Sequence, residues 1–124
     1  AATELVREKA ADILELVGRN DLDVTEKVHV SGDYVGGGYG EPTDAMLEAV
    51  QLLSRLEGLL LDPVYTGKTM SGLIDFVRQG RFRAGQNVVF WHTGGTPALF
   101  AYESIFDATT EPMDPPEPAT ADQG

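Results

Sequence analysis

Residues 62–70 read DPVYTGKTM, a polar loop with one glycine that lies between an apolar run and a helical pattern. A second loop of this kind, WHTGGTP at residues 91–97, closes another apolar run. In open α/β proteins, loops that leave a strand and begin a helix bind ligands, because backbone N–H groups point into the crevice there. We therefore expect the two loops to line one shared pocket.

The rest of the chain is patterned as alternating strands and helices. Three segments have apolar residues at helical spacing and end at a glycine: 3–17, 43–57 and 70–79. Thr43 and Thr96 are typical N-caps, and Pro97 suits the first turn of a fourth helix.

Three further segments are predicted to be strands: 27–31, 59–61 and 88–91. Segment 88–91 is β-branched and aromatic without alternation, which is typical of a strand covered on both faces. The predicted fold class is therefore α/β, a three-layer parallel sheet with helices on both faces.

Composition limits the classes of function. The 124 residues suit one domain, and no apolar run approaches the ~20 residues that cross a bilayer. Acidic residues outnumber basic ones 20 to 9, a balance that disfavours nucleic acid and anionic membrane as partners. Cysteine is absent and only two histidines occur, so no metal site is expected. The start of the chain lacks the pattern of a secretory signal, and a cytoplasmic protein is expected.

Each polar residue of the loops has a plain and a functional interpretation. Thr66 and its neighbours should lie at a helix N-terminus, where free N–H groups favour an anion or an electron-rich ring atom. Lys68 is better explained as a solvated amine than as a Schiff-base residue, because an exposed first turn does not desolvate it. His92 has no readable partner for general-base chemistry. In the glycine-rich stretch 32–42, Tyr39 is either part of a flexible connection or a substrate contact.

Several motifs, in order, resemble the C-terminal part of the D-cysteine desulfhydrase and 1-aminocyclopropane-1-carboxylate deaminase family. They are DYVG with GYGEPT, RLEG, LDPVYTGK, GLI, and HTGG with PALF, at 33–36, 38–43, 55–58, 61–68, 72–74, 92–95 and 97–100. The resemblance covers about residues 3–102. It implies a pyridoxal-phosphate enzyme of the tryptophan-synthase β-like architecture (fold type II), a homodimer that acts on a small amino-acid substrate.

By this resemblance, Tyr39 and Tyr65 face the substrate, with Tyr65 near the cofactor ring. Thr93 bonds the pyridine nitrogen, Thr66 lies beside it, and Gly94 belongs to the cofactor-binding loop. Deaminase members typically carry Glu at the position of Thr66 and Leu at that of Thr93. Two hydroxyls leave the ring nearly neutral, which suits elimination of hydrosulfide better than opening of a cyclopropane. The expected products are pyruvate, ammonia and hydrogen sulfide.

The resemblance also implies that the Schiff-base lysine and the phosphate-binding loop lie in an N-terminal portion that this chain lacks. The chain alone is then expected to be inactive and to need that half as a partner. Residues 103–124 are expected to be a largely mobile acidic, proline-rich tail, with Ile105 and Phe106 able to pack on the body. An aminocyclopropane-carboxylate deaminase, a cysteate sulfo-lyase and a noncatalytic anion-binding or assembly module remain alternatives.

Overall fold

The computed structural model of the protein describes residues 2–24 and 26–107. They belong to two compact units, which divide between Tyr39 and Gly40. Most of the expected tail, residues 108–124, lies outside the described residues. No helix within the described ranges is long and apolar enough to cross a bilayer.

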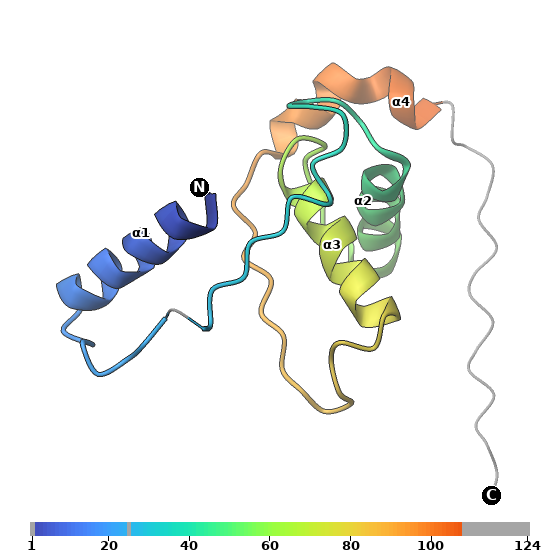
Figure 1. Cartoon of the computed structure of the whole chain (residues 1–124). Coiled ribbons are helices and arrows are strands. Elements are labelled where there is room, and N and C mark those ends of the chain that lie inside the picture. The colour runs from blue at the N-terminus through green and yellow to red at the C-terminus, as the bar shows by residue number, and fades with distance from the viewer. Residues whose placement is uncertain (1, 25, 108–124) are drawn as a thin grey trace, which may run out of the picture. The chain divides into compact units, whose positions relative to one another are not determined.

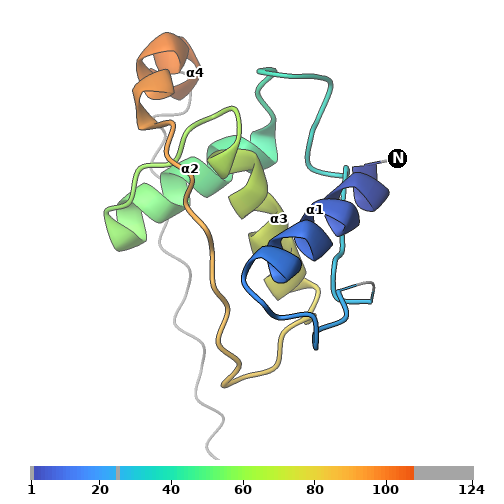
Figure 2. The ribbon, with the colours of Figure 1, turned by 90° about the vertical axis from the view of Figure 1, so that its left-hand side faces the viewer.

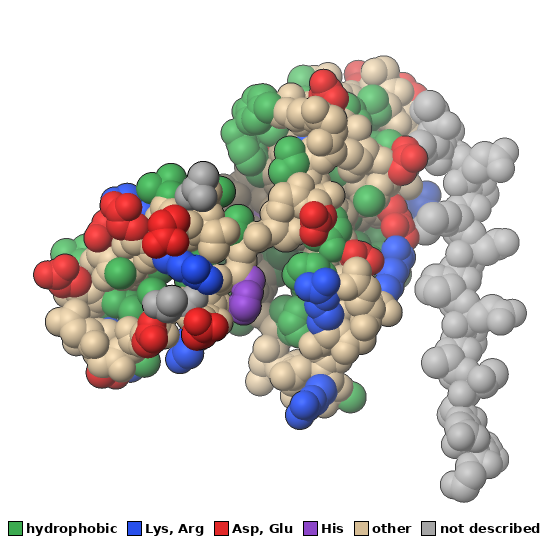
Figure 3. Space-filling view, viewed as in Figure 1, with side chains coloured by type: hydrophobic (Ala, Val, Ile, Leu, Met, Phe, Trp, Pro, Cys, Tyr) green, Lys and Arg blue, Asp and Glu red, His purple; other side chains and the backbone are tan. Residues whose placement is uncertain are grey.

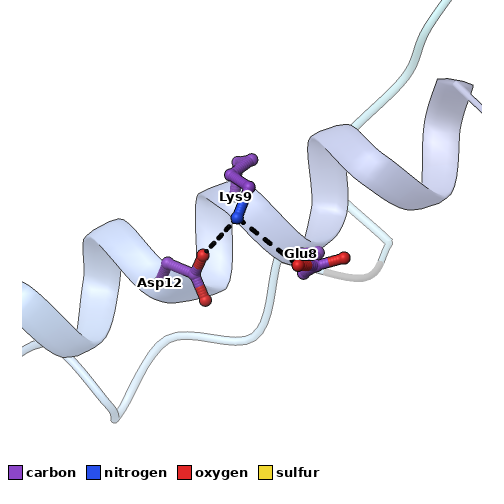
Figure 4. Close-up of polar contacts among 3 residues, drawn as sticks. All are labelled: Glu8, Lys9 and Asp12. Atoms are coloured by element: carbon purple, nitrogen blue, oxygen red, sulfur yellow. Dashed lines mark hydrogen bonds and ion pairs between the residues drawn. The ribbon is translucent and has the colours of Figure 1, made fainter.

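The N-terminal unit contains helix α1, Ala2–Leu16 (Figure 1). Gly18 follows it in the left-handed conformation at φ 70°, as predicted. None of the residues of α1 is buried: among its apolar side chains Val6 and Ile13 are exposed, and Ala10 and Leu14 are half-buried. Lys9 lies between Glu8 and Asp12 on this helix (Figure 4), 2.9 Å from the Asp12 carboxylate and 3.4 Å from that of Glu8.

The C-terminal unit is built on two helices that pack against each other, α2 (Asp44–Glu57) and α3 (Thr66–Arg78). The local signals for α2 are confirmed. The Thr43 hydroxyl accepts a hydrogen bond from the Met46 N–H at 3.2 Å, and Gly58 ends the helix at φ 67°. A 3-10 helix, η1 (Thr96–Tyr102), and the short α4 (Glu103–Asp107) complete the unit. Figure 2 shows η1 and α4 beyond one end of the α2–α3 pair.

The core lies between α2, α3 and the segment that joins them. Met46, Ala49 and Leu61 are fully buried. The helices approach closely at Gly67, where a Cβ atom would lie only 2.9 Å from side-chain carbons of Met46 and Val50. Partly buried apolar side chains complete the core: Leu47, Leu53, Leu73, Ile74, Phe90, Leu99, Ile105 and Phe106. The prediction that Ile105 and Phe106 pack on the body is thus confirmed, although they belong to the segment expected to be tail.

The three predicted strands are not formed in this structure. The described residues contain helices and irregular backbone but no strand, and segments 27–31, 59–61 and 88–91 are among the irregular parts. Figures 1 and 2 show the segment between α3 and η1 as a plain tube. The physical reason is the lack of a neighbour, because a strand exists only where its backbone groups pair with another one. Within the described ranges, the backbone of residues 88–91 makes no hydrogen bond.

Charged side chains cover much of the surface. Figure 3 shows acidic groups scattered over the viewed face of both units, with Lys and Arg between them. The cross-helix ion pair is Arg78–Glu48, in which the guanidinium donates to both carboxylate oxygens. This pair joins the C-terminal turn of α3 to α2. Arg81 stacks 4.1 Å from the ring centroid of Phe76.

Candidate functional site

Asp62 organises the first loop. Its side chain is 1% exposed, and its two carboxylate oxygens accept four hydrogen bonds. Oδ2 accepts from the N–H groups of Val64 and Tyr65 at 2.9 and 2.8 Å. Oδ1 accepts from the N–H of Thr66 at 2.8 Å and from its hydroxyl at 2.6 Å. The backbone of Asp62 takes part too, since its N–H donates to the Thr66 hydroxyl and its C=O accepts from Gly67 N–H, both at 2.8 Å.

This arrangement keeps Asp62 ionised. Burial acts to raise the pKa of its carboxyl group, but the hydrogen bonds from the Thr66 hydroxyl and from the N–H groups of Thr66, Tyr65 and Val64 outweigh burial and lower the pKa. The negative charge also lies at the N-terminus of α3, where the helix dipole favours it. Asp62 is therefore a buried anion that caps this helix.

The prediction of free N–H groups at this helix N-terminus is wrong. Asp62 takes the N–H groups of residues 64–67 through its carboxylate and its carbonyl oxygen. An external anion would have to displace an anion that is covalently part of the loop. The start of α3 is consequently a rigid, satisfied turn and not an open phosphate cradle.

The second loop is held by His92. Its Nδ1 accepts a hydrogen bond from Gly94 N–H at 3.0 Å, and its Nε2 lies 3.0 Å from the carbonyl oxygen of Leu60. Because a carbonyl only accepts, Nε2 carries the proton, and the ring is the neutral Nε2–H tautomer. Both ring nitrogens are thus engaged in backbone contacts.

The two loops lie against each other, and the pocket expected between them stays a prediction. Gly95 lies against Asp62 so closely that a Cβ atom on it would be 2.8 Å from Cγ and 2.9 Å from Oδ1 of that carboxylate. The Thr96 hydroxyl donates to the Leu60 carbonyl at 3.3 Å, which adds to the bridge made by His92. Gly95, at φ 95°, is the residue before the first turn of η1. The prediction of Thr96 as N-cap is therefore wrong by one residue, because its side chain bonds across to the first loop instead.

The predicted site residues differ in exposure. Tyr65 is 58% exposed at the start of α3, and Thr93 and Gly94 are exposed on the second loop. Thr66, by contrast, is 2% exposed and turned toward Asp62. The Thr93 hydroxyl has no hydrogen-bond partner among residues 2–24 and 26–107. Tyr65, Thr66, Thr93 and Gly94 therefore belong to two adjoining loops of one unit.

Tyr39 is separate from this group. It is 79% exposed and is the last residue of the N-terminal unit, whereas the two loops belong to the C-terminal unit. Its neighbour Gly40 belongs to the C-terminal unit, where its carbonyl accepts a 2.7 Å hydrogen bond from the Tyr102 hydroxyl. One end of the glycine-rich stretch is thereby fixed, and the substrate contact of Tyr39 stays a prediction.

Lys68 and Lys9 lie in different surroundings. Lys68 was expected to be solvated, but it is 8% exposed, because almost the whole first half of α3 is buried. Lys9 is solvated, and hydrogen bonds to Asp12 and Glu8 raise its pKa, which keeps the amine charged. A Schiff-base lysine needs a lowered pKa, so Lys9 is unsuited to that chemistry.

Two residues central to the site were missed from sequence. Asp62 was seen only as the residue before a proline, and its place four residues before Thr66, the first residue of α3, does not match a capping box. Gly95 was assigned to a turn, and nothing local indicated its contact with Asp62. In the part of the chain described, no group of three His, Asp or Glu residues is placed to hold a metal ion.

Comparison with known proteins identifies the family of the chain. Residues 3–94 match the family described as pyridoxal-phosphate dependent enzyme, and the chain belongs to that family. The family depends on pyridoxal phosphate and implies the tryptophan-synthase β-like fold.

Among individual proteins, the chain is similar to D-cysteine desulfhydrases. It is 55% identical over 87 residues to the one from Salmonella typhi and to the one from Salmonella newport. The match covers 70% of this chain but only 26% of each relative. The chain therefore spans about a quarter of the relatives' length.

The residues of the two loops fit one end of pyridoxal phosphate. An exposed phenol ring, Tyr65, and an unengaged hydroxyl, Thr93, suit the face and the nitrogen of a pyridine ring. Gly94 has open space around it, whereas Gly95 lies against the side chain of Asp62. The satisfied start of α3 does not suit the cofactor's phosphate. The structure thus fits the ring end of the cofactor.

Proposed function

We propose that residues 1–102 are the C-terminal part of a pyridoxal-phosphate-dependent lyase of the D-cysteine desulfhydrase type. The meeting of the two loops at Asp62 and Gly95 carries this proposal, because it brings the segments of Thr66 and Thr93 together. The names of the relatives support the substrate. Of the tail expected at 103–124, the helix α4 (Glu103–Asp107) belongs instead to the packed body.

In the proposed reaction, the α-proton of D-cysteine is removed and hydrosulfide leaves the β-carbon. Addition of water then gives pyruvate and ammonia, so the balance is cysteine plus water to pyruvate, ammonia and hydrogen sulfide. When bound, the cofactor supplies the electron sink for this chemistry. The part of this chain is to pack Tyr65 on the ring, hold the ring nitrogen with the Thr93 hydroxyl beside Thr66, and let Gly94 approach closely. Tyr39 contacts the substrate.

The rest of the site would come from the remainder of the enzyme. We propose that the Schiff-base lysine, the phosphate loop and the neighbouring strands of a parallel sheet belong to an N-terminal portion, and that segments 59–61 and 88–91 join that sheet. The unpaired backbone of 88–91 and its exposed apolar side chains support this role. By the same proposal, the isolated chain is inactive, and the complete enzyme is a cytoplasmic homodimer.

The test is reconstitution. The chain is combined with the N-terminal portion of a D-cysteine desulfhydrase such as the Salmonella typhi protein, and bound cofactor is followed by visible absorbance and sulfide by a colorimetric assay. We expect a visible band and sulfide release from D-cysteine only in the mixture. A Thr66→Glu and Thr93→Leu double variant, which has the acid and apolar residues of the deaminases, should keep cofactor binding and lose most sulfide release. A mixture without a band, or sulfide release unchanged in the double variant, would overturn the proposal.

The same mixture separates the alternatives. Sulfite from cysteate would favour a sulfo-lyase, and a four-carbon keto acid from 1-aminocyclopropane-1-carboxylate would favour a deaminase. The noncatalytic anion-binding module loses its main support here, because Asp62 already fills the start of α3.

A further inference from the structure

The two threonines of the proposed cofactor site, Thr66 and Thr93, differ in whether their hydroxyl hydrogen is already used in a hydrogen bond within the chain. A hydroxyl has one hydrogen to donate and two lone pairs to accept with. At Thr66, the 2.6 Å contact with Asp62 Oδ1 uses the hydrogen, because an ionised carboxylate only accepts. The 2.8 Å contact with the Asp62 N–H uses one lone pair, because an amide N–H only donates. Both roles follow from the chemistry of the partners.

Asp62 has little freedom to release that hydrogen. Its Oδ2 accepts hydrogen bonds from two backbone N–H groups and its Oδ1 from a third. Gly95 also lies against the carboxylate, so closely that a Cβ atom would not fit between them. Rotation of the carboxylate would leave the buried N–H of Thr66 and the part-buried N–H groups of Val64 and Tyr65 without this acceptor. The direction of the Thr66 hydroxyl is therefore fixed by residues that lie behind it.

We infer that Asp62 is a positioning residue that consumes the hydroxyl hydrogen of Thr66, so that Thr93 alone of the two threonines donates a hydrogen bond to the cofactor's ring nitrogen. An unprotonated pyridine nitrogen only accepts hydrogen bonds, so it cannot form one with the remaining lone pair of Thr66, which is also an acceptor. Thr93 is exposed on the adjoining loop, and its hydroxyl is unengaged within the described residues. The lowered pKa of Asp62 supports the ionised form on which this accounting depends.

This inference rests on the proposed function for its cofactor, but its first test does not. In the 124-residue chain, a hydroxyl proton held by a buried carboxylate should exchange slowly with water and be visible by proton NMR. We expect one such threonine signal, lost in Thr66→Val and kept in Thr93→Val. In Asp62→Asn the signal should be lost or broadened. Absence of a protected signal, or its persistence in Thr66→Val, would overturn the role given to Asp62.

The second test uses the complete enzyme loaded with pyridoxal phosphate that carries nitrogen-15 in the ring. The nitrogen resonance reports hydrogen bonding at that atom, which a change in folding stability alone does not move. Thr93→Val should shift it toward the value of a nitrogen without a donor, and Thr93→Ser should restore it. Thr66→Val should leave it close to wild type. An equal or larger shift in Thr66→Val would refute the inference, whereas failure of the wild type to bind the cofactor would refute the proposed function.

Discussion

Gly95 and Gly94 provide a matched pair of substitutions that isolates the contact between the two loops. Both glycines have φ 95°, so alanine at either position is forced into a left-handed backbone. Their surroundings differ, because a Cβ atom at Gly94 meets nothing within 4 Å, whereas one at Gly95 lies 2.8 Å from Asp62 Cγ. The difference between the two alanine variants is therefore the cost of pushing the second loop away from Asp62.

The magnitude follows from two contributions. The left-handed backbone costs an alanine about 1–2 kcal/mol at either site. Overpacking adds about 1–3 kcal/mol at Gly95 only, because Asp62 is pinned by four hydrogen bonds and cannot yield as a flexible side chain would. At about 4 °C per kcal/mol for a domain of this size, Gly95→Ala should melt about 4–12 °C below Gly94→Ala.

Thermal unfolding followed by circular dichroism measures this difference, and amide hydrogen exchange locates it. In Gly95→Ala the N–H groups of Val64, Tyr65 and Thr66 should exchange faster, because the displaced carboxylate no longer accepts from all three. In Gly94→Ala these amides should keep their protection. Equal melting temperatures, together with unchanged protection of residues 64–66, would refute the contact between the loops.

Three further predictions concern the same unit. Gly67→Ala should lower the free energy of unfolding by about 1–3 kcal/mol or more, since its Cβ would lie 2.8 Å from the Asp62 carbonyl oxygen. The control Gly32→Ala, with open space around it, should change that free energy by less than about 1 kcal/mol. Equal effects of the two variants in urea unfolding would contradict this prediction. The folded pKa of Asp62 is below its unfolded value, so its contribution is complete above about pH 4 and is lost as pH falls through the folded pKa. Melting temperatures between pH 6 and 2 should therefore fall less steeply in Asp62→Asn, and parallel profiles would reject the ionised cap. A double-mutant cycle on Glu48 and Arg78 should give a coupling free energy of about 0.5–1 kcal/mol, which becomes smaller in 1 M salt. A coupling free energy that does not change with salt would contradict a solvated ion pair.

Helix α2 shows what local sequence can specify. Its start at Thr43 depends on a side chain three residues from the N–H that it caps, and its end depends on the freedom of Gly58 to adopt a positive φ. Both signals are contained within a few residues, and both were predicted correctly. The meeting of the two loops was also predicted, from the rule that ligand loops gather where strands end and helices begin.

The features that the sequence did not predict, or that this structure does not form, depend on contacts between residues far apart in the sequence. Strand 88–91 was predicted from residue types alone and is not formed here; it stays a prediction, because pairing needs a neighbour that the described residues do not supply. Lys68 was placed in solvent because helical position says nothing about how closely another element packs, and small residues let α2 bury that turn. The contact of Gly95 with Asp62 joins residues 33 positions apart and left no local signal.

Asp62 also explains how the proposed site would be divided between this chain and the rest of the enzyme. A carboxylate at the start of α3 makes the turn rigid, and it also occupies the N–H groups that a cofactor phosphate would otherwise use. A dianionic phosphate would moreover be repelled by a buried negative charge in the same turn. The phosphate must then be bound away from α3, which leaves the ring end as the part of the cofactor that these two loops can hold. Asp62 thus excludes the phosphate from this turn, and it also fixes the turn from which Tyr65 would contact the cofactor's ring.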